Sequence, residues 1–168
     1  GAMVMAGGGA TWDIRSSSIS GTVHNGIDLS NSGTVDITTS TISGAVGFNI
    51  TGGGAVTLSG STVTGITTRA VNIAATSTYT ISNSTLLGNT ETLQLASTAT
   101  LAINGNYFKS TLAGANGINV VGVTTTINST TNGNSFCQNL ATQVAGGAFA
   151  GTFVLASQAS AGAIIVCP

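Results

Sequence analysis

Charged residues are scarce in this chain: Asp, Glu, Lys and Arg make up 4% of its 168 residues, against about a quarter in an average soluble domain. Three basic and four acidic residues give a net charge of −1, and no basic stripe is present, so we expect no nucleic-acid partner. No apolar run approaches the ~20 residues that span a bilayer, and no basic amphipathic segment occurs, so we expect no membrane insertion.

Histidine occurs once, at His24 in an expected turn. A lone imidazole can act as a general base only with a partner group in reach, and Asp28 is the acidic residue nearest to it in the sequence. Across the chain, the ionisable groups are too few to build an ordinary acid–base site. We therefore predict no catalytic residue, no metal and no cofactor.

Cysteine and proline are also rare, with two cysteines and one proline. The scarcity of proline suits long strand ladders that cannot lose an N–H donor. Cys137 and Cys167 match no zinc or redox spacing. We expect a disulfide that ties down the C-terminus in an oxidising setting, which predicts an extracellular or cell-surface location. Two buried thiols remain the alternative.

A phrase rich in small polar residues recurs along the chain. "TISNSTLLG" at 80–88 matches "DIRSSSISG" (13–21), "DITTSTISG" (36–44), "TLSGSTVTG" (57–65) and, more loosely, "AINGNYFKS" (102–110). The first apolar residue of each copy is Ile14, Ile37, Leu58, Ile81 or Ile103, and Ile127 is the expected sixth. A second apolar residue follows five positions later, at Ile19, Ile42, Val63, Leu86 and Phe108.

A repeat of ~22 residues indicates a repeat architecture, and a local period of two within it indicates strands with one buried face. The sequence predicts an all-β, single-chain right-handed parallel β-helix over residues 4–130, with about 5–6 coils of ~22 residues stacked ~4.8 Å apart. Residues 131–168 depart from the pattern, and we expect an irregular C-terminal cap there, with room for one further irregular coil. Residues 1–3, "GAM", are typical of a tag scar, which implies that the natural protein continues N-terminally.

These repeats resemble those of right-handed parallel β-helix proteins, the pectate-lyase-like superfamily. "ISNSTLLGN", "ITTSTISG" and "LSGSTVTG" carry the resemblance, which covers residues 11–130. The superfamily includes polysaccharide lyases and hydrolases, phage tailspikes and bacterial surface adhesins. The resemblance implies the fold, whereas the repeat is scaffold and leaves the function open.

Two outward columns follow from the predicted register. The first holds candidate ligand-binding residues that could hydrogen-bond sugar hydroxyls along a glycan: Asp28, Asn49, Asn72, Gln94 and Asn119. In the alternative interpretation, these side chains bond one another and stiffen the stack. The second column runs Ser17, Ser40, Ser61, Ser84 and Asn106, and we expect it to be a structural turn ladder. Tyr107, next to the inward Phe108, is the aromatic candidate for ligand contact.

A third column contains Asp13, Asp36, Thr57, Thr80, Ala102 and Thr126. Asp13 and Asp36, with Arg15 beside them, could form a small acidic site. The lyases of the superfamily bind calcium through clustered carboxylates and use an Arg or Lys as base. The simpler interpretation is that Arg15 compensates two exposed carboxylates, since calcium needs 6–8 oxygen ligands. Arg69 and Glu91 fall at equivalent positions of neighbouring coils and predict a surface salt bridge.

The sequence favours a non-catalytic extracellular binding domain. We expect the tip or shaft of a bacterial surface fibre or a phage-tail-like fibre that adheres to a glycan or another cell-surface receptor, and a homotrimer remains open. The alternative is a polysaccharide lyase or hydrolase, or a fragment of one. A third hypothesis, ice binding, needs regular outward threonine pairs on consecutive coils, and the column from Asp13 to Thr126 is too irregular for it.

Overall fold

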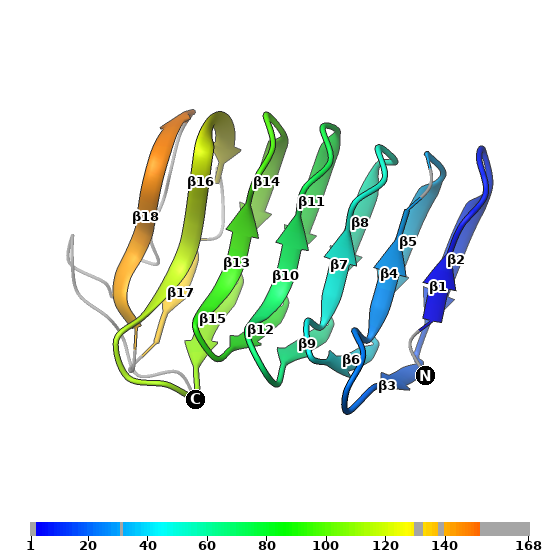
Figure 1. Cartoon of the computed structure of the whole chain (residues 1–168), viewed down its shortest axis with the longest axis horizontal. Coiled ribbons are helices and arrows are strands. Elements are labelled where there is room, and N and C mark those ends of the chain that lie inside the picture. The colour runs from blue at the N-terminus through cyan, green and yellow to red at the C-terminus, as the bar shows by residue number, and fades with distance from the viewer. Residues whose placement is uncertain (1–2, 31, 130–132, 138–139, 152–168) are drawn as a thin grey trace.

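The computed structural model describes residues 3–30, 32–129, 133–137 and 140–151. Short strands stack in parallel into a β-helix of about six coils with ~23 residues in each, and the described residues contain no helix. The coils follow one another along the long axis of the molecule (Figure 1). The predicted parallel β-helix is therefore confirmed.

Each full coil contributes strands to three faces. The first face holds β1 (Met3–Met5), β4 (Ile27–Leu29), β7 (Phe48–Ile50), β10 (Arg69–Ile73) and β13 (Glu91–Leu95). The second face holds β2 (Thr11–Arg15), β5 (Thr34–Thr38), β8 (Val56–Ser59), β11 (Thr78–Ser82) and β14 (Thr100–Asn104). The third face holds β3 (Ser18–Ser20), β6 (Thr41–Gly44), β9 (Thr62–Gly65), β12 (Thr85–Gly88), β15 (Tyr107–Ser110) and β17 (Ser135–Phe136).

The long strand β16 (Ala115–Asn128) joins the first two faces, because it pairs with both β13 and β14. β18 (Leu140–Ala150) then pairs in parallel with β16 through two register shifts. Together β17 and β18 add a further, irregular coil beyond residue 130. The rest of the expected cap, over 152–168, lies outside the described residues.

The core consists of inward columns in which like side chains stack from coil to coil. On the third face Ile42, Val63, Leu86 and Phe108 follow one another in register, and all four are buried. Phe108 continues the column onto Phe136, with ring centroids 4.7 Å apart and planes 7° apart. This separation is close to the ~4.8 Å spacing of neighbouring strands, so aromatic stacking here follows directly from the coil geometry.

One predicted position is wrong by two residues. Ile127 lies opposite Leu101 and not opposite Ile103, and Ala102 pairs with Asn128 instead of Thr126. In this register the polar residues Thr125 and Ser129 take buried positions two residues before and after Ile127, and the hydroxyl of Thr125 donates to the carbonyl of Ala99 at 2.5 Å. A hydroxyl that bonds a backbone carbonyl can be buried at little cost, so an alignment based on apolar residues alone misses the slip.

The turn between the second and third faces contains the predicted serine ladder. In each step a backbone N–H donates to the side-chain oxygen of the next coil at 3.0–3.2 Å, and the chain of bonds runs Ser17, Ser40, Ser61, Ser84, Asn106 and Asn134. From Ser40 to Asn134 these side chains are buried. Buried polar groups need such partners, so the ladder satisfies backbone donors that the turn would otherwise leave unpaired.

Glycine is required where the third face turns into the first. A Cβ at Gly65 would lie 1.8 Å from the carbonyl oxygen of Arg69, and a Cβ at Gly88 would lie 1.8 Å from that of Glu91. Real Cβ atoms never approach a backbone oxygen so closely. These two glycines therefore let the chain fold back sharply enough to place Arg69 and Glu91 at the first residues of β10 and β13.

Candidate functional site

The predicted amide column lies in register on the outward side of the first face. Asp28, Asn49, Asn72, Gln94 and Asn119 occupy paired outward positions of β4, β7, β10, β13 and β16. The alternation of the strands produces this arrangement, because the residues on either side of each one point into the core. All five side chains are half-buried.

Neighbouring members of the amide column bond one another. Asn49 donates from Nδ2 to Oδ1 of Asp28 at 2.8 Å, and Asn72 donates in the same way to Oδ1 of Asn49 at 2.8 Å. Asn25, which the sequence analysis missed, donates to the same Asp28 oxygen at 2.7 Å, and its own Oδ1 accepts from the N–H of Val46 at 3.2 Å. Amide ladders of this kind stabilise stacked parallel strands.

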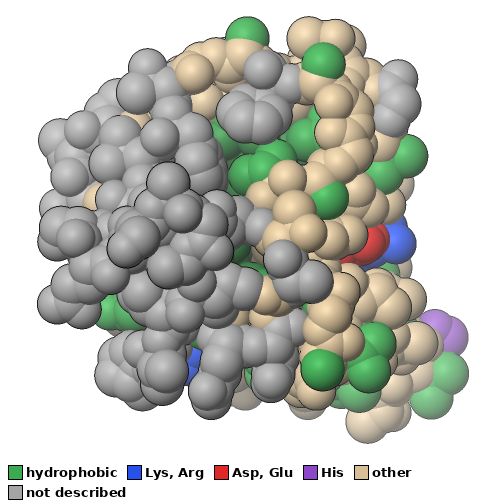
Figure 2. All heavy atoms as spheres, turned by 90° about the vertical axis from the view of Figure 1, so that its left-hand side faces the viewer, with side chains coloured by type: hydrophobic (Ala, Val, Ile, Leu, Met, Phe, Trp, Pro, Cys, Tyr) green, Lys and Arg blue, Asp and Glu red, His purple; other side chains and the backbone are tan. Residues whose placement is uncertain are grey.

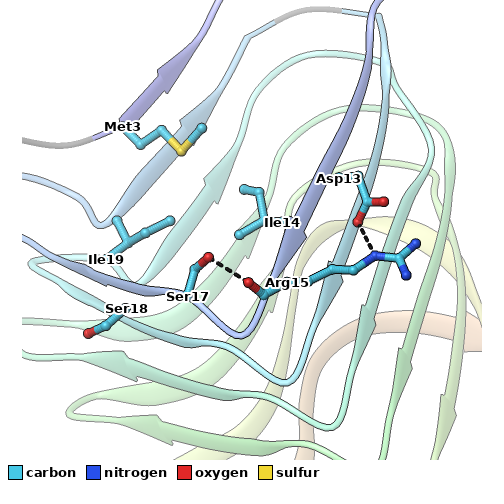
Figure 3. Close-up of a pocket in the computed structure, with 7 residues that line it drawn as sticks. All are labelled: Met3, Asp13, Ile14, Arg15, Ser17, Ser18 and Ile19. Atoms are coloured by element: carbon cyan, nitrogen blue, oxygen red, sulfur yellow. Dashed lines mark hydrogen bonds and ion pairs between the residues drawn. The ribbon is translucent and has the colours of Figure 1, made fainter.

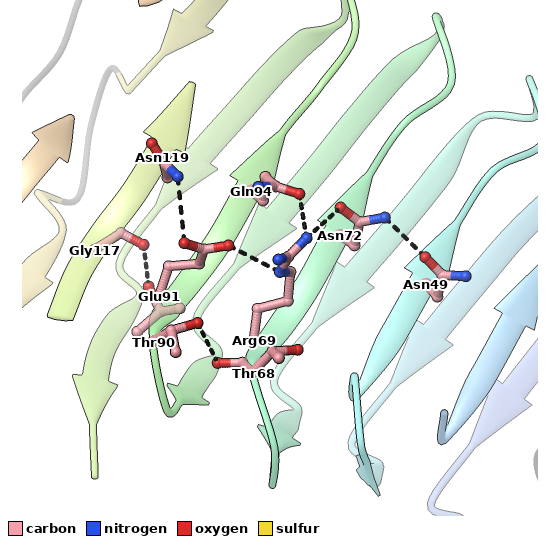
Figure 4. Close-up of polar contacts among 10 residues, drawn as sticks. Asn49, Thr68, Arg69, Asn72, Thr90, Glu91, Gln94, Gly117 and Asn119 are labelled. Atoms are coloured by element: carbon pink, nitrogen blue, oxygen red, sulfur yellow. Dashed lines mark hydrogen bonds and ion pairs between the residues drawn. The ribbon is translucent and has the colours of Figure 1, made fainter. Parts of the chain in front are cut away.

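Arg69 and Glu91 lie beside this column at the first residues of β10 and β13, and Figure 4 shows their side chains reaching toward Asn72, Gln94 and Asn119. Nη1 of Arg69 donates to Oδ1 of Asn72 at 3.2 Å and to Oε1 of Gln94. On the other side, Nδ2 of Asn119 donates to Oε2 of Glu91 at 3.2 Å. The two charged residues thus join the separate amides into one polar network from β4 to β16.

The Arg69–Glu91 pair differs from the exposed salt bridge that the sequence predicted. Its side chains are only 23% and 9% exposed, and Nε of Arg69 lies 2.9 Å from Oε1 of Glu91. This contact is ionic without a well-directed hydrogen bond, since neither atom has a hydrogen-bond partner among the described residues. Desolvating two charges costs free energy that their attraction only partly returns, so the pair contributes more to the arrangement of the network than to stability.

The amides of the column keep hydrogen-bonding capacity for a ligand. A primary amide has two N–H donors and two acceptor lone pairs. In the part of the chain that the structure describes, Asn49 and Asn72 each use one donor and one acceptor within the network. One N–H and one lone pair of each side chain are therefore left at the surface, repeated at the strand spacing.

The predicted acidic site lies on the second face, away from the amide column. Asp13 and Asp36 are paired in register on β2 and β5, as predicted. Nε of Arg15 donates to Oδ1 of Asp13 at 2.7 Å, and both side chains are well exposed, at 71% for Arg15 and 48% for Asp13. The hydrogen bond from Arg15 lowers the pKa of Asp13 below its ordinary value. This arrangement matches the charge-compensation interpretation.

Tyr107 does not lie beside the amide column. It belongs to β15 on the third face, between Thr85 and Ser135, and it is 36% exposed.

His24 lies in the exposed turn before β4, and no hydrogen bond to its imidazole is found among the described residues. Oδ1 of the neighbouring Asp28 already accepts from Asn25 and Asn49.

Cys137 is buried directly after β17. Its expected partner Cys167 lies outside the described residues, so the disulfide stays a prediction.

Within the described ranges, no group of three or more His, Cys, Asp or Glu side chains could hold a metal ion. A search of the same residues for helices long and apolar enough to cross a membrane finds none.

Two groups of paired outward threonines on the second face were not predicted from the sequence. Thr11 pairs with Thr34, and Thr78 pairs with Thr100, which in turn pairs with Thr126. The sequence contains a signal for these positions: each threonine directly precedes an inward residue of its strand, which predicts an outward side chain. Among the described residues visible from the side of β18, few acidic or basic side chains appear (Figure 2).

Comparison with known proteins places the chain in a family. The family model described as "Right handed beta helix region" matches residues 2–161. Neither the search of curated proteins nor the search of solved structures finds a match. Because the family model covers almost the whole chain and the parallel coils agree with it, the chain belongs to the right-handed β-helix family.

Proposed function

We propose that this chain is a non-catalytic extracellular binding domain, part of the tip or shaft of a bacterial surface fibre or a phage-tail-like fibre, that adheres to cell-surface glycans. The observation that carries the proposal is the amide column, an in-register line of polar side chains across β4, β7, β10, β13 and β16. Sugar hydroxyls both donate and accept hydrogen bonds, and so do amides.

Pre-organisation supports this use of the amide column. The amides of Asn49 and Asn72 are held by bonds to their neighbours, so a ligand would not have to order them on binding. A rigid binding surface loses less conformational entropy than a flexible one. The low charge of the chain also suits a neutral ligand, since 4% charged residues create little field to attract an ionic one.

The alternative function, a polysaccharide lyase or hydrolase or part of one, would use a different face. Its candidate residues are Asp13, Asp36 and Arg15 on the second face. Paired carboxylates could serve glycoside hydrolysis, but the close contact of Arg15 with Asp13 favours charge compensation. We therefore place this function second.

A glycan-array screen of the purified chain, with product analysis for each glycan that binds, tests the proposal. We expect binding without cleavage, and loss of about tenfold in affinity for Asn49→Ala and for Asn72→Ala, because each removes about 1.4 kcal/mol of hydrogen bonding. Thr80→Ala on the second face is the matched control and should bind as the wild type does.

Cleavage products would contradict the non-catalytic proposal and would direct mutagenesis to Asp13, Asp36 and Arg15. Absence of binding across the array would contradict glycan recognition and leave a structural shaft segment as the better account. Equal loss of binding in Thr80→Ala would show that the amide column is not the binding surface.

A further inference from the structure

The hydrogen-bond direction of the amide column reverses at Gln94. Asn72 directs its Nδ2 toward Asn49 on the preceding coil and its Oδ1 toward Arg69. Gln94 is turned the other way, since its Oε1 accepts from the same Nη1 of Arg69. A guanidinium has only donors, so Arg69 fixes this orientation. Nε2 of Gln94 therefore points away from β10 and toward β16 (Figure 4).

Asn119 keeps the ordinary direction of the column. Its Nδ2 points back toward β13 and donates to Oε2 of Glu91 at 3.2 Å. Its Oδ1 lies on the side of β18, where a Cβ built on Gly146 would come within 2.9 Å of it. An ionised carboxylate only accepts, so Glu91 fixes this orientation. Because Gln94 and Asn119 are paired in register, two amide nitrogens face each other across the space between them, which we call the amide gap.

The amide gap contains more donors than the chain itself uses. Among the described residues, no hydrogen bond to Nε2 of Gln94 is found, and Asn119 uses one of its two side-chain N–H groups. Two facing N–H groups cannot bond each other, whereas one oxygen with two lone pairs accepts from both. Neighbouring strands lie ~4.8 Å apart, so an oxygen in the gap can lie within ~2.9 Å of both nitrogens. Glu91 beside the gap repels an anionic acceptor, so the gap suits a neutral carbonyl oxygen.

Apolar side chains border the amide gap. Val121 lies two positions after Asn119 on β16, on the same outward side, and it is 44% exposed. Ala96 lies two positions after Gln94 and is half-buried. Because Gln94 and Asn119 are paired, these two apolar residues follow them side by side. A methyl group attached to a carbonyl in the gap would be removed from water there, which is favourable.

We propose that the amide gap binds the acetamido group of N-acetylated sugars, with its carbonyl oxygen between Gln94 and Asn119 and its methyl group against Val121. The inference rests on the proposed glycan binding and names the class of glycan, a neutral one that contains N-acetylhexosamine. Arg69 and Glu91 are positioning residues that act through the two amides. Hydrogen bonds in a chain polarise one another, so the bond from Arg69 makes the N–H groups of Gln94 stronger donors.

Pairs of oligosaccharides test the inference. The two members of a pair are identical, except that N-acetylglucosamine or N-acetylgalactosamine in one replaces glucose or galactose in the other. We expect the whole chain to bind the acetamido member about tenfold more tightly, the effect of one hydrogen bond. In NMR spectra of ¹⁵N-labelled protein, this member should shift the side-chain amide signals of Gln94 and Asn119.

The outcomes separate this inference from the proposed function. Equal affinity within each pair, or tighter binding of the hydroxyl member, would overturn the acetamido site and leave glycan binding intact. So would acetamido binding that leaves both amide signals unshifted. Absence of binding to every glycan would overturn both proposals.

Gln94→Glu is the main variant, because it keeps an oxygen for Arg69 and replaces the free N–H donors of the gap. It should bind both members of a pair equally. Ser18→Glu is the matched control, since it adds the same charge on β3 in a separate hollow of about 600 Å³ (Figure 3). It should keep the tenfold preference, and an equal loss there would contradict the amide gap as the site.

Val121→Ser tests the methyl contact independently at an exposed position. It should weaken binding of the acetamido member about threefold and leave the hydroxyl member unchanged, because one apolar contact is lost. If circular dichroism shows that Gln94→Glu does not fold, an undiminished preference in Val121→Ser contradicts the site.

Discussion

At the scale of single residues, Tyr79 shows how a polar group is accommodated in the core. Its ring is buried, and its hydroxyl donates to the carbonyl of Ala75 at 2.8 Å. The same carbonyl also accepts from Ser97 at 2.8 Å. Burial raises the pKa of Tyr79 to about 12, because the interior disfavours the phenolate.

This raised pKa predicts an alkaline loss of stability. The contribution of neutral Tyr79 is complete below its ordinary pKa of 10.0 and is lost as the pH rises toward a folded-state pKa of about 12. Tyr79→Phe should remove this loss, and at neutral pH it should cost only about 0.5–1 kcal/mol of unfolding free energy, since Ser97 still satisfies Ala75.

Urea unfolding of both proteins across the alkaline range measures the effect. Tyr107→Phe, on the exposed third face, is the control and should leave the neutral-pH stability unchanged. An alkaline stability loss of the same size in Tyr79→Phe as in the wild type would show that Tyr79 is not its source.

At the scale of elements, the serine ladder connects neighbouring coils at the turn between the second and third faces. Ser61 Oγ accepts from the N–H of Ser40 at 3.0 Å and donates to the carbonyl of Ser59 at 2.9 Å. It is buried, so no water replaces these bonds if the side chain is removed. One hydroxyl thus satisfies backbone groups of two adjacent coils.

Ser61→Ala should therefore lower the unfolding free energy by about 1–3 kcal/mol, the cost of leaving a buried donor unpaired. Thermal and urea unfolding measure it. Thr62→Ala, an exposed neighbour on β9, is the control and should change stability by less than about 0.5 kcal/mol. Equal effects of the two substitutions would mean that strand propensity, and not the ladder, determines stability at this turn.

The polar network on the first face is also an element-scale feature. Its residues lie on several coils, and stacking brings Asn72 within reach of Asn49, Arg69 within reach of Gln94, and Glu91 within reach of Asn119. The network uses part of the hydrogen-bonding capacity of each amide and orients the donors and acceptors that remain. Stability and proposed binding therefore depend on the same register.

At the scale of the whole molecule, stability is expected to vary along the axis of the β-helix. Each coil contacts only its neighbours, so a repeat protein behaves as a line of coupled units. Interior coils have two neighbours, whereas the first coil has one in the isolated chain. Local opening should therefore begin at the ends.

Hydrogen exchange of the backbone amides tests this expectation. Amides of β8 and β11 should exchange more slowly than those of β2 and β3. Uniform protection along the axis at low concentration would show that the coils unfold in a single cooperative step.

The sequence by itself determined the repeat, the strands and the register of most of the chain. Side-chain alternation and coil length are local properties, so the columns through Asp28 and through Asp13 could be predicted before any contact was known. The two-residue slip at Ile127 could not be predicted, because the buried residues two positions before and after Ile127 are the polar Thr125 and Ser129, which an apolar pattern does not contain.

Only the tertiary structure decided how the columns are used. The burial of Arg69 and Glu91, the bonds that join Asn49 to Asp28, and the separation of Tyr107 from the amide column all depend on how coils stack and turn. A repeat pattern predicts which residues share a column, but contacts between columns depend on turn geometry and side-chain reach, which one coil does not contain.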